Sequence, residues 1–294
     1  VALSIDPGSA LLVSCSHDEW VRVWDLNTFQ KLHETKPDLG KLHDATWHPD
    51  GQSLAISGES GVALWNLASG AITKISDHGL LESNVIWTES ALMICGDHGT
   101  LKICDPHTGD LAQTISVSKA PISALALAPN GQSLAVLSRD GVMRLWDCSH
   151  WKSLWATNPM YQAIGKLSFD PCGEYLMTTG GAGAQSIVWR FEDGRPIALL
   201  GTYNSAGCWT KQGDSILQGT PGGSVHEFSI KTIESQMAKL GLDSTNPFRI
   251  DPIRPWIVGG AGSDTVWSVA ASHDGQWIAV ATHSGAVKLW QADS

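Results

Sequence analysis

The chain has 294 residues, a formal net charge of −10 and an aromatic content dominated by tryptophan, with 14 Trp against 3 Tyr and 5 Phe. This acidic balance argues against nucleic acid or an anionic membrane surface as the main partner, because both attract basic surface. No apolar run is long enough to span a bilayer, so the sequence does not predict a membrane protein either.

The cysteines predict a reducing compartment. Six of them are scattered along the chain without a CxxC pair, and several lie in apolar, strand-like runs. A free thiol in such a run behaves as a small hydrophobic side chain. Neither a secretory signal pattern nor an Asn-x-Ser/Thr sequon is present. We therefore expect reduced thiols and a cytoplasmic location.

Seven short apolar runs along the chain end in an aromatic residue or a substitute for one. In chain order, the residues that end these runs are Trp24, Trp65, Cys104, Trp146, Trp189, Phe228 and Trp290. The first six recur every 39 to 43 residues, whereas the last gap is 62 residues, which is one repeat plus an insertion. A period of about 40–45 residues is typical of four-stranded propeller blades.

Two series of turn signals place further strands around each run. Motifs such as His-Pro-Asp-Gly at 48–51 and Ala-Pro-Asn-Gly at 128–131 precede the middle strand of a repeat. Proline fixes φ, and Gly or Asn tolerates a positive φ, so these motifs predict tight turns. Dipeptides such as Asp140-Gly141 follow the middle strand, where they favour a hairpin. Each repeat thus predicts three antiparallel strands and a weaker outer strand.

Seven repeats predict seven blades within one domain at 1–294. A four-stranded sheet cannot bury both of its faces alone, so blades stacked in a ring bury each face against a neighbour. The expected blades are 1–38, 39–79, 80–119, 120–160, 161–201, 202–260 and 261–294. Large aromatics repeated at the blade period are expected to pack between blades. These structural anchors are Trp24, Trp65, Trp146, Trp189 and Trp290.

The repeats resemble the WD40 family over the whole chain. The matching features are the dipeptides Trp24-Asp25 and Trp146-Asp147, the turn aspartates Asp18 and Asp140, and the nearly continuous pattern at 265–290. The resemblance implies an all-β, seven-bladed propeller of four-stranded antiparallel blades. The family's Gly-His dipeptide is missing. We therefore expect its internal His–Asp–Ser/Thr–Trp hydrogen-bond network to be absent or partial in most blades.

The last blade is expected to have three strands of its own, because the sequence stops just after the run that ends at Trp290. WD40 rings usually close by pairing strands from both chain ends, which removes an open edge. We expect residues upstream of Val1 to supply the outer strand. The alternative is a blade that keeps three strands.

An insertion at about 231–254 interrupts the sixth blade, ahead of an outer strand expected near 256–259. Its first part predicts a short helix with a capping residue, an apolar face and a terminal glycine, formed by Thr232, Ile233, Met237, Leu240 and Gly241. Residues 246–252 predict an irregular loop. We expect the helix to cover its own blade. The alternative is a docking element for a partner.

No catalytic, cofactor-binding or metal-binding site is predicted. The sequence contains no HExxH, P-loop, GxSxG or EF-hand motif. His43 and His48 share one strand segment, but this spacing is too weak to indicate zinc.

The turns between second and third strands, with the starts of the inner strands, form the face that WD40 propellers most use for partners. Eight aromatic or ionisable residues map there: His17, Trp20, His43, Glu59, Asp97, Arg139, Trp267 and His283. Such a cluster favours an interaction patch. The alternative for each residue is a solvated turn position or a local cap. Because the first and last blades are ring neighbours, we expect His17 and His283 on adjacent blades.

The leading hypothesis is a non-catalytic scaffold that binds a protein or peptide through its rim and channel mouth. It would be a monomeric propeller, and one domain of a larger protein. No nucleic acid, membrane or cofactor is expected as a partner. The alternative is a propeller enzyme or a small-ligand-binding protein with a site at the central channel, where Ser83, Ser123 and Ser205 begin inner strands.

Overall fold

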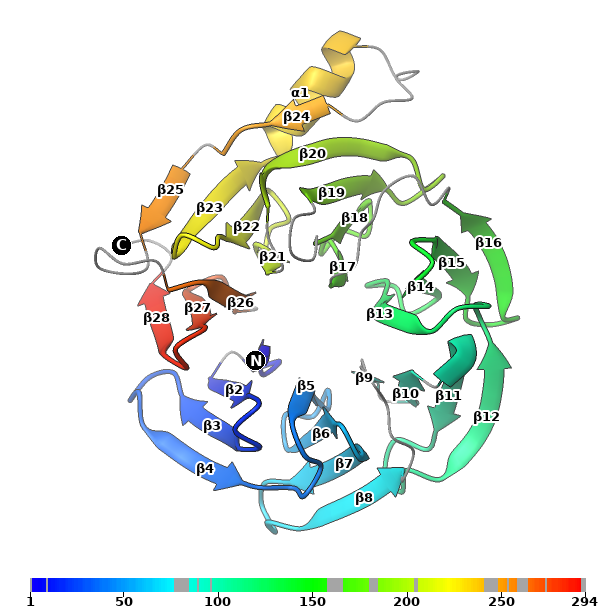
Figure 1. Cartoon of the computed structure of the whole chain (residues 1–294), viewed down its shortest axis with the longest axis vertical. Helices are drawn as coiled ribbons and strands as arrows, with labels where there is room; N and C mark the ends of the chain where they lie inside the picture. The colour runs from blue at the N-terminus through cyan, green and yellow to red at the C-terminus, as the bar shows by residue number, and fades with distance from the viewer. Residues whose placement is uncertain are drawn as a thin grey trace. The chain divides into compact units, whose positions relative to one another are not determined.

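Short strands joined by tight turns make up nearly all of the regular structure. A computed structural model describes residues 2–8, 10–76, 85–88, 90–95, 97–157, 166–179, 185–203, 206–240, 248–252, 254–257, 264–272 and 274–291. The strands form seven separate sheets, of which the last has three strands and the others four or five. The fold is a seven-bladed β-propeller with a three-stranded last blade, which confirms the fold class predicted from the repeats (Figure 1).

The strands fall into two compact units, one formed by Val1–Ile122 with Ser272–Trp277 and the other by Ser123–Ala271 with Ile278–Ser294. The first unit holds three four-stranded sheets. Their strands are β1 (Ala2–Ile5), β2 (Leu11–Cys15), β3 (Val21–Asp25) and β4 (Lys31–Thr35), then β5 (Leu42–Trp47), β6 (Ser53–Gly58), β7 (Gly61–Asn66) and β8 (Ile72–Ser76), then β9 (Val85–Trp87), β10 (Leu92–Cys95), β11 (Thr100–Cys104) and β12 (Leu111–Ser116). A 3-10 turn, η1 (Asp97–Gly99), precedes β11.

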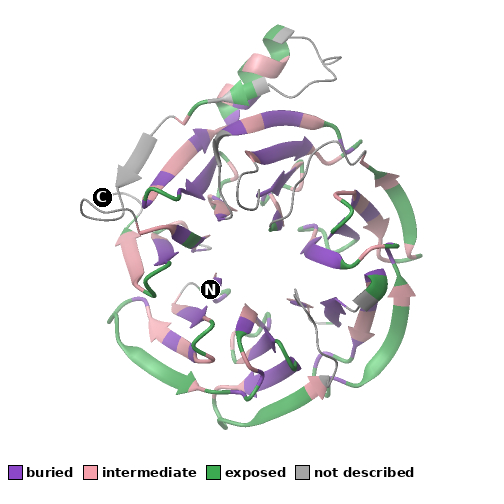
Figure 2. Ribbon diagram, in the orientation of Figure 1, coloured by how far each residue is buried: buried purple, intermediate pink, exposed green. Residues whose placement is uncertain are grey.

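Neighbouring sheets of the first unit bury apolar faces against each other. Val13 and Val23 of the first sheet share a core cluster with Leu54 and Trp65 of the second. The opposite face of the second sheet joins a further cluster with β9 and β10. The outer strands β4 and β12 are largely exposed (Figure 2). Burial is thus concentrated on the inner strands, as expected when each sheet is covered by its neighbours.

The second unit contains the remaining four sheets. Their strands are β13 (Ile122–Leu127), β14 (Ser133–Ser138), β15 (Met143–Asp147) and β16 (Lys152–Ala156), then β17 (Leu167–Phe169), β18 (Tyr175–Thr178), β19 (Gln185–Arg190), β20 (Pro196–Tyr203) and β24 (Phe248–Ile250), then β21 (Gly207–Trp209), β22 (Ser215–Gly219), β23 (Ser224–Ser229) and β25 (Arg254–Ile257), then β26 (Val266–Ala271), β27 (Trp277–Thr282) and β28 (Val287–Gln291).

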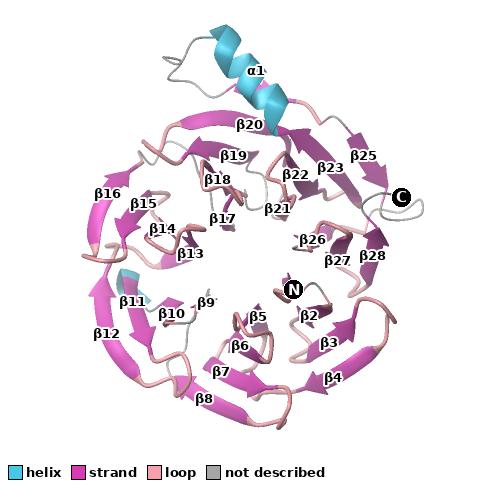
Figure 3. Ribbon diagram, turned by 180° about the vertical axis from the view of Figure 1, so that it is seen from behind, coloured by secondary structure: helices cyan, strands magenta, loops and turns pink. Residues whose placement is uncertain are grey.

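The insertion forms helix α1 (Ile230–Leu240), which lies outside β20 (Figure 3), and strand β24, which also lies outside β20 (Figure 1). The predicted capping role of Thr232 is wrong, because the helix already begins at Ile230, whose N–H donates to the Asp214 carbonyl 2.9 Å away. Gly241 lies outside the described residues. The irregular loop predicted for 246–252 is wrong at 248–250, where β24 pairs in parallel with β20. The outer strand expected near 256–259 is β25, which lies two residues earlier.

Helix α1 covers more than its own sheet. Ile230 and Ile233 are buried in a cluster that includes Phe228 of β23 and also Ala198 and Leu200 of β20. The helix therefore packs on two neighbouring sheets of the second unit. The expectation that it covers only the sixth blade was too narrow.

The anchor tryptophans differ in burial and in hydrogen bonding. Trp65 and Trp189 are each only 3% exposed, whereas Trp24, Trp146 and Trp290 are half-buried. The Trp24 indole N–H donates to Ser14 Oγ, and the Trp189 indole N–H donates to Thr178 Oγ1, both at 2.9 Å. The buried Nε1 of Trp146 has no hydrogen-bond partner among the described residues. The tryptophan part of the family's network is therefore present in some blades and missing in others.

Candidate functional site

In the first unit, the β2–β3 turn and the start of β5 bring two predicted residues together. His17 lies in the turn, and His43 lies near the first residue of β5, where the pairing with β6 shifts register between Leu42 and Asp44. The two imidazole rings meet edge to face, with centroids 6.4 Å apart. Because of this irregular pairing, the His43 side chain need not follow the regular alternation of side chains between the two faces of β5. We call His17, Trp20, His43 and Glu59 the rim cluster.

The environment of His17 disfavours its protonated form. His17 is an exposed residue, yet partial burial of its ring is the largest reason that its pKa is lowered. The positive charges of His43 and Lys41 lower the pKa further, and Glu59 partly offsets them. The ring is therefore held in its neutral form, able both to donate and to accept a hydrogen bond.

Trp20 of the rim cluster is held in place by the turn aspartate. Asp18 Oδ1 accepts hydrogen bonds from the Ser16 hydroxyl and the Trp20 N–H, and its Oδ2 accepts one from Arg22 at 2.8 Å. Partial burial of Asp18 acts against ionisation, but these hydrogen bonds hold its pKa below the usual value. The Arg22 guanidinium in turn lies 5.8 Å from the centre of the half-buried Trp20 ring.

Glu59 has a local structural role in the rim cluster. Its Oε2 accepts a hydrogen bond from the Lys41 N–H at 3.3 Å, and its Oε1 lies 3.8 Å from Lys41 Nζ. Gly40 has a φ of +68°, and a Cβ there would lie 2.7 Å from Glu59 Oε2. Glu59 thus caps the turn before β5, which is the alternative considered for it from the sequence. Its carboxylate is still exposed on the same face as His17 and His43.

In the second unit, Trp267 and His283 form a stacked pair. Trp267 on β26 is 38% exposed, and its ring lies 5.5 Å from that of His283 at an interplanar angle of 32°. His283 belongs to the β27–β28 turn. Asp264 fixes this turn by accepting hydrogen bonds from the Ser284 N–H and hydroxyl.

The other predicted residues are placed differently. Arg139 is exposed in the β14–β15 turn, on another sheet from Trp267 and His283. Asp97 begins η1, but its side chain lies outside the described residues, as do Ser83 and Ser205. His17 and His283 belong to different units, so their expected proximity stays a prediction.

Sequence reasoning missed the charged residues that support these clusters. Arg22 lies in the apolar run that ends at Trp24, two residues beyond Trp20, and the sequence analysis assigned it no supporting role. Asp264 and Lys41 precede inner strands. The turn motifs used in the sequence analysis flank the middle strands, so they do not point to these two residues. Gly40-Lys41 was the available clue, because a glycine just before a strand often marks a positive φ.

Comparison with known proteins agrees with the strand pattern. The profile described as "WD domain, G-beta repeat" matches residues 1–25, 109–147 and 256–291. These stretches include both Trp-Asp dipeptides and the well-formed last repeat. The chain is thus similar to WD40-repeat proteins in these three stretches, and its fold is the seven-bladed β-propeller that the resemblance implied.

Several curated WD40 relatives align over much of the chain. Autophagy-related protein 16 of Arabidopsis thaliana is 22% identical over 254 residues, which is 81% of this chain and 48% of the relative. Cell division cycle 20.1, cofactor of APC complex, of the same plant is 25% identical over 67% of this chain and 46% of the relative. COMPASS component SWD3 of Saccharomyces cerevisiae is 26% identical over 48% of this chain and 49% of the relative. The chain thus spans about half the length of these relatives.

Two further properties of the described part of this chain bear on its chemistry. No group of three or more His, Cys, Asp or Glu side chains in it is arranged to hold a metal ion. None of its helices combines the length and apolar character that crossing a membrane requires.

Proposed function

We propose that the chain is a non-catalytic scaffold that binds a protein or peptide through the face formed by its second-to-third-strand turns. The proposed contacts are His17, Trp20, His43, Glu59, Asp97, Arg139, Trp267 and His283. The observation that carries the proposal is the pairing of rings at these turns, in which His17, Trp267 and His283 are exposed and His43 is half-buried. His17 meets His43 in one unit, and Trp267 stacks on His283 in the other. Exposed aromatics beside ionisable groups are typical of binding hot spots.

The WD40 relatives support an interaction role. One is described as a cofactor of the APC complex, one as a component of COMPASS and one as a transcriptional corepressor. These names refer to an assembly or to transcriptional regulation, and none of the three refers to a reaction. We infer by this analogy that the chain has no catalytic activity. As a further part of the proposal, it acts as a monomeric propeller domain of a larger protein.

The proposed compartment is the cytoplasm. All six cysteines are free. Burial raises the pKa of the Cys148 thiol to about 11 and that of the Cys208 thiol to about 12, so both remain protonated and unreactive at neutral pH. A fluorescent fusion of the chain should distribute through the cytoplasm. Accumulation in the secretory pathway would contradict this part of the proposal.

The binding role is tested by comparing partners of the wild-type chain with those of two double variants. Full-length chains carrying H17A and H43A, or W267A and H283A, are used as baits in quantitative affinity purification. H150A is the matched control, because His150 is an exposed histidine in the β15–β16 turn, at the opposite end of its sheet from the β14–β15 turn. We expect a defined set of partners to be lost with at least one double variant and kept with the control. Equal recovery with all four baits, at unchanged melting temperature, would refute the proposal.

A further inference from the structure

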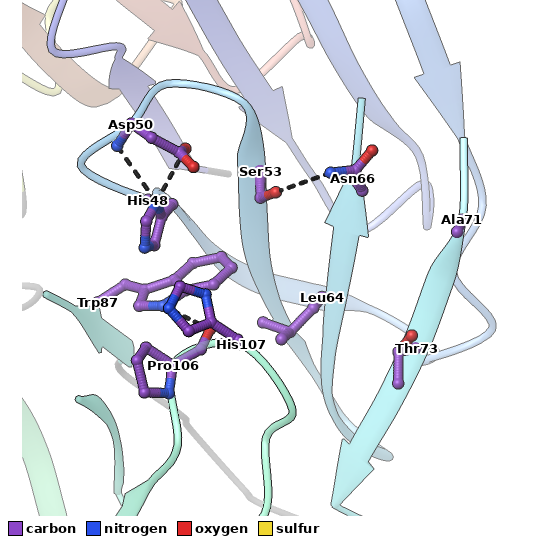
Figure 4. Close-up of a pocket in the computed structure, with 10 residues that line it drawn as sticks. All are labelled: His48, Asp50, Ser53, Leu64, Asn66, Ala71, Thr73, Trp87, Pro106 and His107. Carbon is purple, nitrogen blue, oxygen red and sulfur yellow. Dashed lines mark hydrogen bonds and ion pairs between the residues drawn. The ribbon is translucent and has the colours of Figure 1, made fainter. Parts of the chain in front are cut away.

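A pocket of about 260 Å³ lies between the second and third sheets of the first unit (Figure 4). Its floor is formed by the buried residues His48, Leu64, Trp87 and Pro106. Exposed residues at its mouth are Asp50, Ala71, Thr73 and His107. The pocket therefore combines an apolar floor with a polar entrance.

The pocket is separate from the rim cluster. Asp50 lies in the β5–β6 turn and His107 in the β11–β12 turn, whereas Glu59 lies in the β6–β7 turn. Because β6 runs from one end of its antiparallel sheet to the other, the turns before and after it lie at opposite ends. A ligand in the pocket would leave the rim cluster free.

The floor of the pocket is fixed by contacts within the chain. The Trp87 indole N–H donates to the Pro106 carbonyl at 3.1 Å, which joins β9 to the β11–β12 turn. The His48 ring stands edge-on to Trp87, with centroids 4.8 Å apart, and its Nδ1 lies 2.8 Å from Asp50 Oδ1. Only 7% of His48 is exposed. A pocket held this firmly needs little reorganisation to receive a ligand.

Asp50 places a negative charge at the mouth. Partial burial works against ionisation, but the Gln52 N–H and the His48 ring hold the pKa of this carboxyl below its usual value. Both of these contacts are made to Oδ1, and Oδ2 has no hydrogen-bond partner within the described part of the chain. The carboxylate can therefore accept a hydrogen bond from a ligand without giving up one that shapes the turn.

We propose that this pocket receives a lysine or arginine side chain from a protein partner. Its volume is below the range of about 300–1,000 Å³ that is usual for small-molecule sites, so it fits one side chain rather than a metabolite. Leu64, Trp87 and Pro106 would cover the aliphatic stem, and Asp50 would bind the charged head. The chain's net charge of −10 favours a basic partner over an acidic one.

The first test is an NMR titration of the full ¹⁵N-labelled chain with three blocked tripeptides, acetyl-Gly-Arg-Gly-amide and its Lys and Glu counterparts. The Trp87 indole N–H and the Gln52 backbone N–H report on the floor and the mouth. We expect saturable shifts of both signals with the Arg or the Lys peptide and none with the Glu peptide. Equal shifts with the Glu peptide would show an anion site built on the two histidines and would overturn the proposal, as would no saturable shift with either basic peptide.

The second test uses the variant D50N. Asn is compatible with this turn, because Asn130 occupies the same position in the β13–β14 turn and its Oδ1 accepts the Gln132 N–H at 2.9 Å. Asp50 Oδ1 accepts the Gln52 N–H in the same way at 2.8 Å. Loss of one charge-assisted hydrogen bond should weaken binding of the basic peptide by about tenfold or more.

The matched control is D274N. Asp274 occupies the same position in the β26–β27 turn, where its Oδ1 accepts the Gln276 N–H at 3.0 Å. This change removes the same charge far along the chain from the pocket and should leave binding unchanged. Wild-type affinity in D50N, or an equal loss in D274N, would contradict a specific role for Asp50. Neither result depends on the rim cluster, so this test and the test of the proposed function can fail separately.

Discussion

One position on the second strand of a blade decides whether the anchor tryptophan finds a hydrogen-bond partner. Trp24 pairs with Leu12, and Ser14, two residues further on the same face, accepts its indole N–H. Trp189 pairs with Leu176, and Thr178 lies two residues further. Trp146 pairs with Leu134, but the residue two further is Val136, and the buried indole nitrogen has no partner in the described structure.

This position predicts opposite effects for two reciprocal substitutions. Thr178→Val removes the hydroxyl that accepts the buried Trp189 N–H at 2.9 Å and should destabilise the chain by about 1–3 kcal/mol. Val136→Thr supplies an acceptor to Trp146 and should stabilise the chain by about 0.5–1.5 kcal/mol. Urea unfolding at constant m-value measures both changes. If Val136→Thr were as destabilising as Thr178→Val, the two positions would not be equivalent.

A second residue-scale rule governs the turn between first and second strands. Asp6 opens this turn in the first blade, and its carboxylate accepts the N–H groups of Gly8, Ala10 and Leu11. Asp170 accepts two N–H groups in the same way in the fifth blade. His48 stands at the equivalent position, and its Nδ1 contacts Asp50 Oδ1 at 2.8 Å. The ring fills more space than a carboxylate, and its other edge becomes the floor of the pocket.

At the scale of elements, the sequence predicted the blade strands, their turns and the helix of the insertion, but not strand β24. Two sequence features indicate each blade strand: the alternation of apolar and polar residues along it, and turn residues at a fixed spacing on either side of it. Strand β24 has only three residues. It forms by pairing with the free edge of β20, which is about 50 residues earlier in the chain. A segment whose structure depends on a distant edge leaves little local signal. The same holds for the start of α1, which is set by Asp214.

Helix α1 is expected to stabilise two blades through a single buried side chain. Ile233 is fully buried among residues of β20 and β23. The neighbouring Tyr175 hydroxyl donates to Glu234 Oε1 at 3.5 Å, and burial, with the Glu234 charge, raises the pKa of Tyr175 to about 12. Because Ile233→Ala would leave a cavity among these buried side chains, it should lower the free energy of unfolding by about 2–5 kcal/mol.

The control for this helix is Ser235→Ala, an exposed position in the same element. It should change stability by no more than about 0.5 kcal/mol. Thermal and urea unfolding of both variants would distinguish a structural helix from one that only extends into solvent. An unchanged midpoint for Ile233→Ala would favour the docking role considered for this insertion instead.

At the scale of the whole molecule, the sequence predicted the candidate site only in part. Residues in the turns could be assigned to one end of their own blade, because repeat register fixes the end of the blade on which a turn lies. The contact between His17 and His43 also depends on the irregular pairing in β5, which no spacing reveals. The pocket beside Asp50 was not predicted, because it is formed by residues from two sheets whose side-chain packing is not encoded in either repeat alone.

Histidine protonation should set the acid sensitivity of the whole chain near neutral pH. Burial is the largest cause of the lowered pKa of His17 and the only one for His226, whose Nδ1 is buried without a partner among the described residues. In the unfolded chain both histidines have a pKa of 6.5. Below that pH the unfolded chain binds protons at these two side chains more readily than the folded chain does. Their contribution to stability is therefore complete above that pH and is lost as the pH falls through the folded pKa values.

Urea unfolding between about pH 7.5 and 5.5 should accordingly show falling stability, before carboxylates such as Asp18 and Asp264 add their own loss at lower pH. His17→Gln and His226→Gln should each flatten this dependence, and the double variant should flatten it most. The control Gln132→Asn changes an exposed, non-titrating side chain and should keep the wild-type slope. A double variant with the full wild-type slope would show that other groups carry the acid sensitivity.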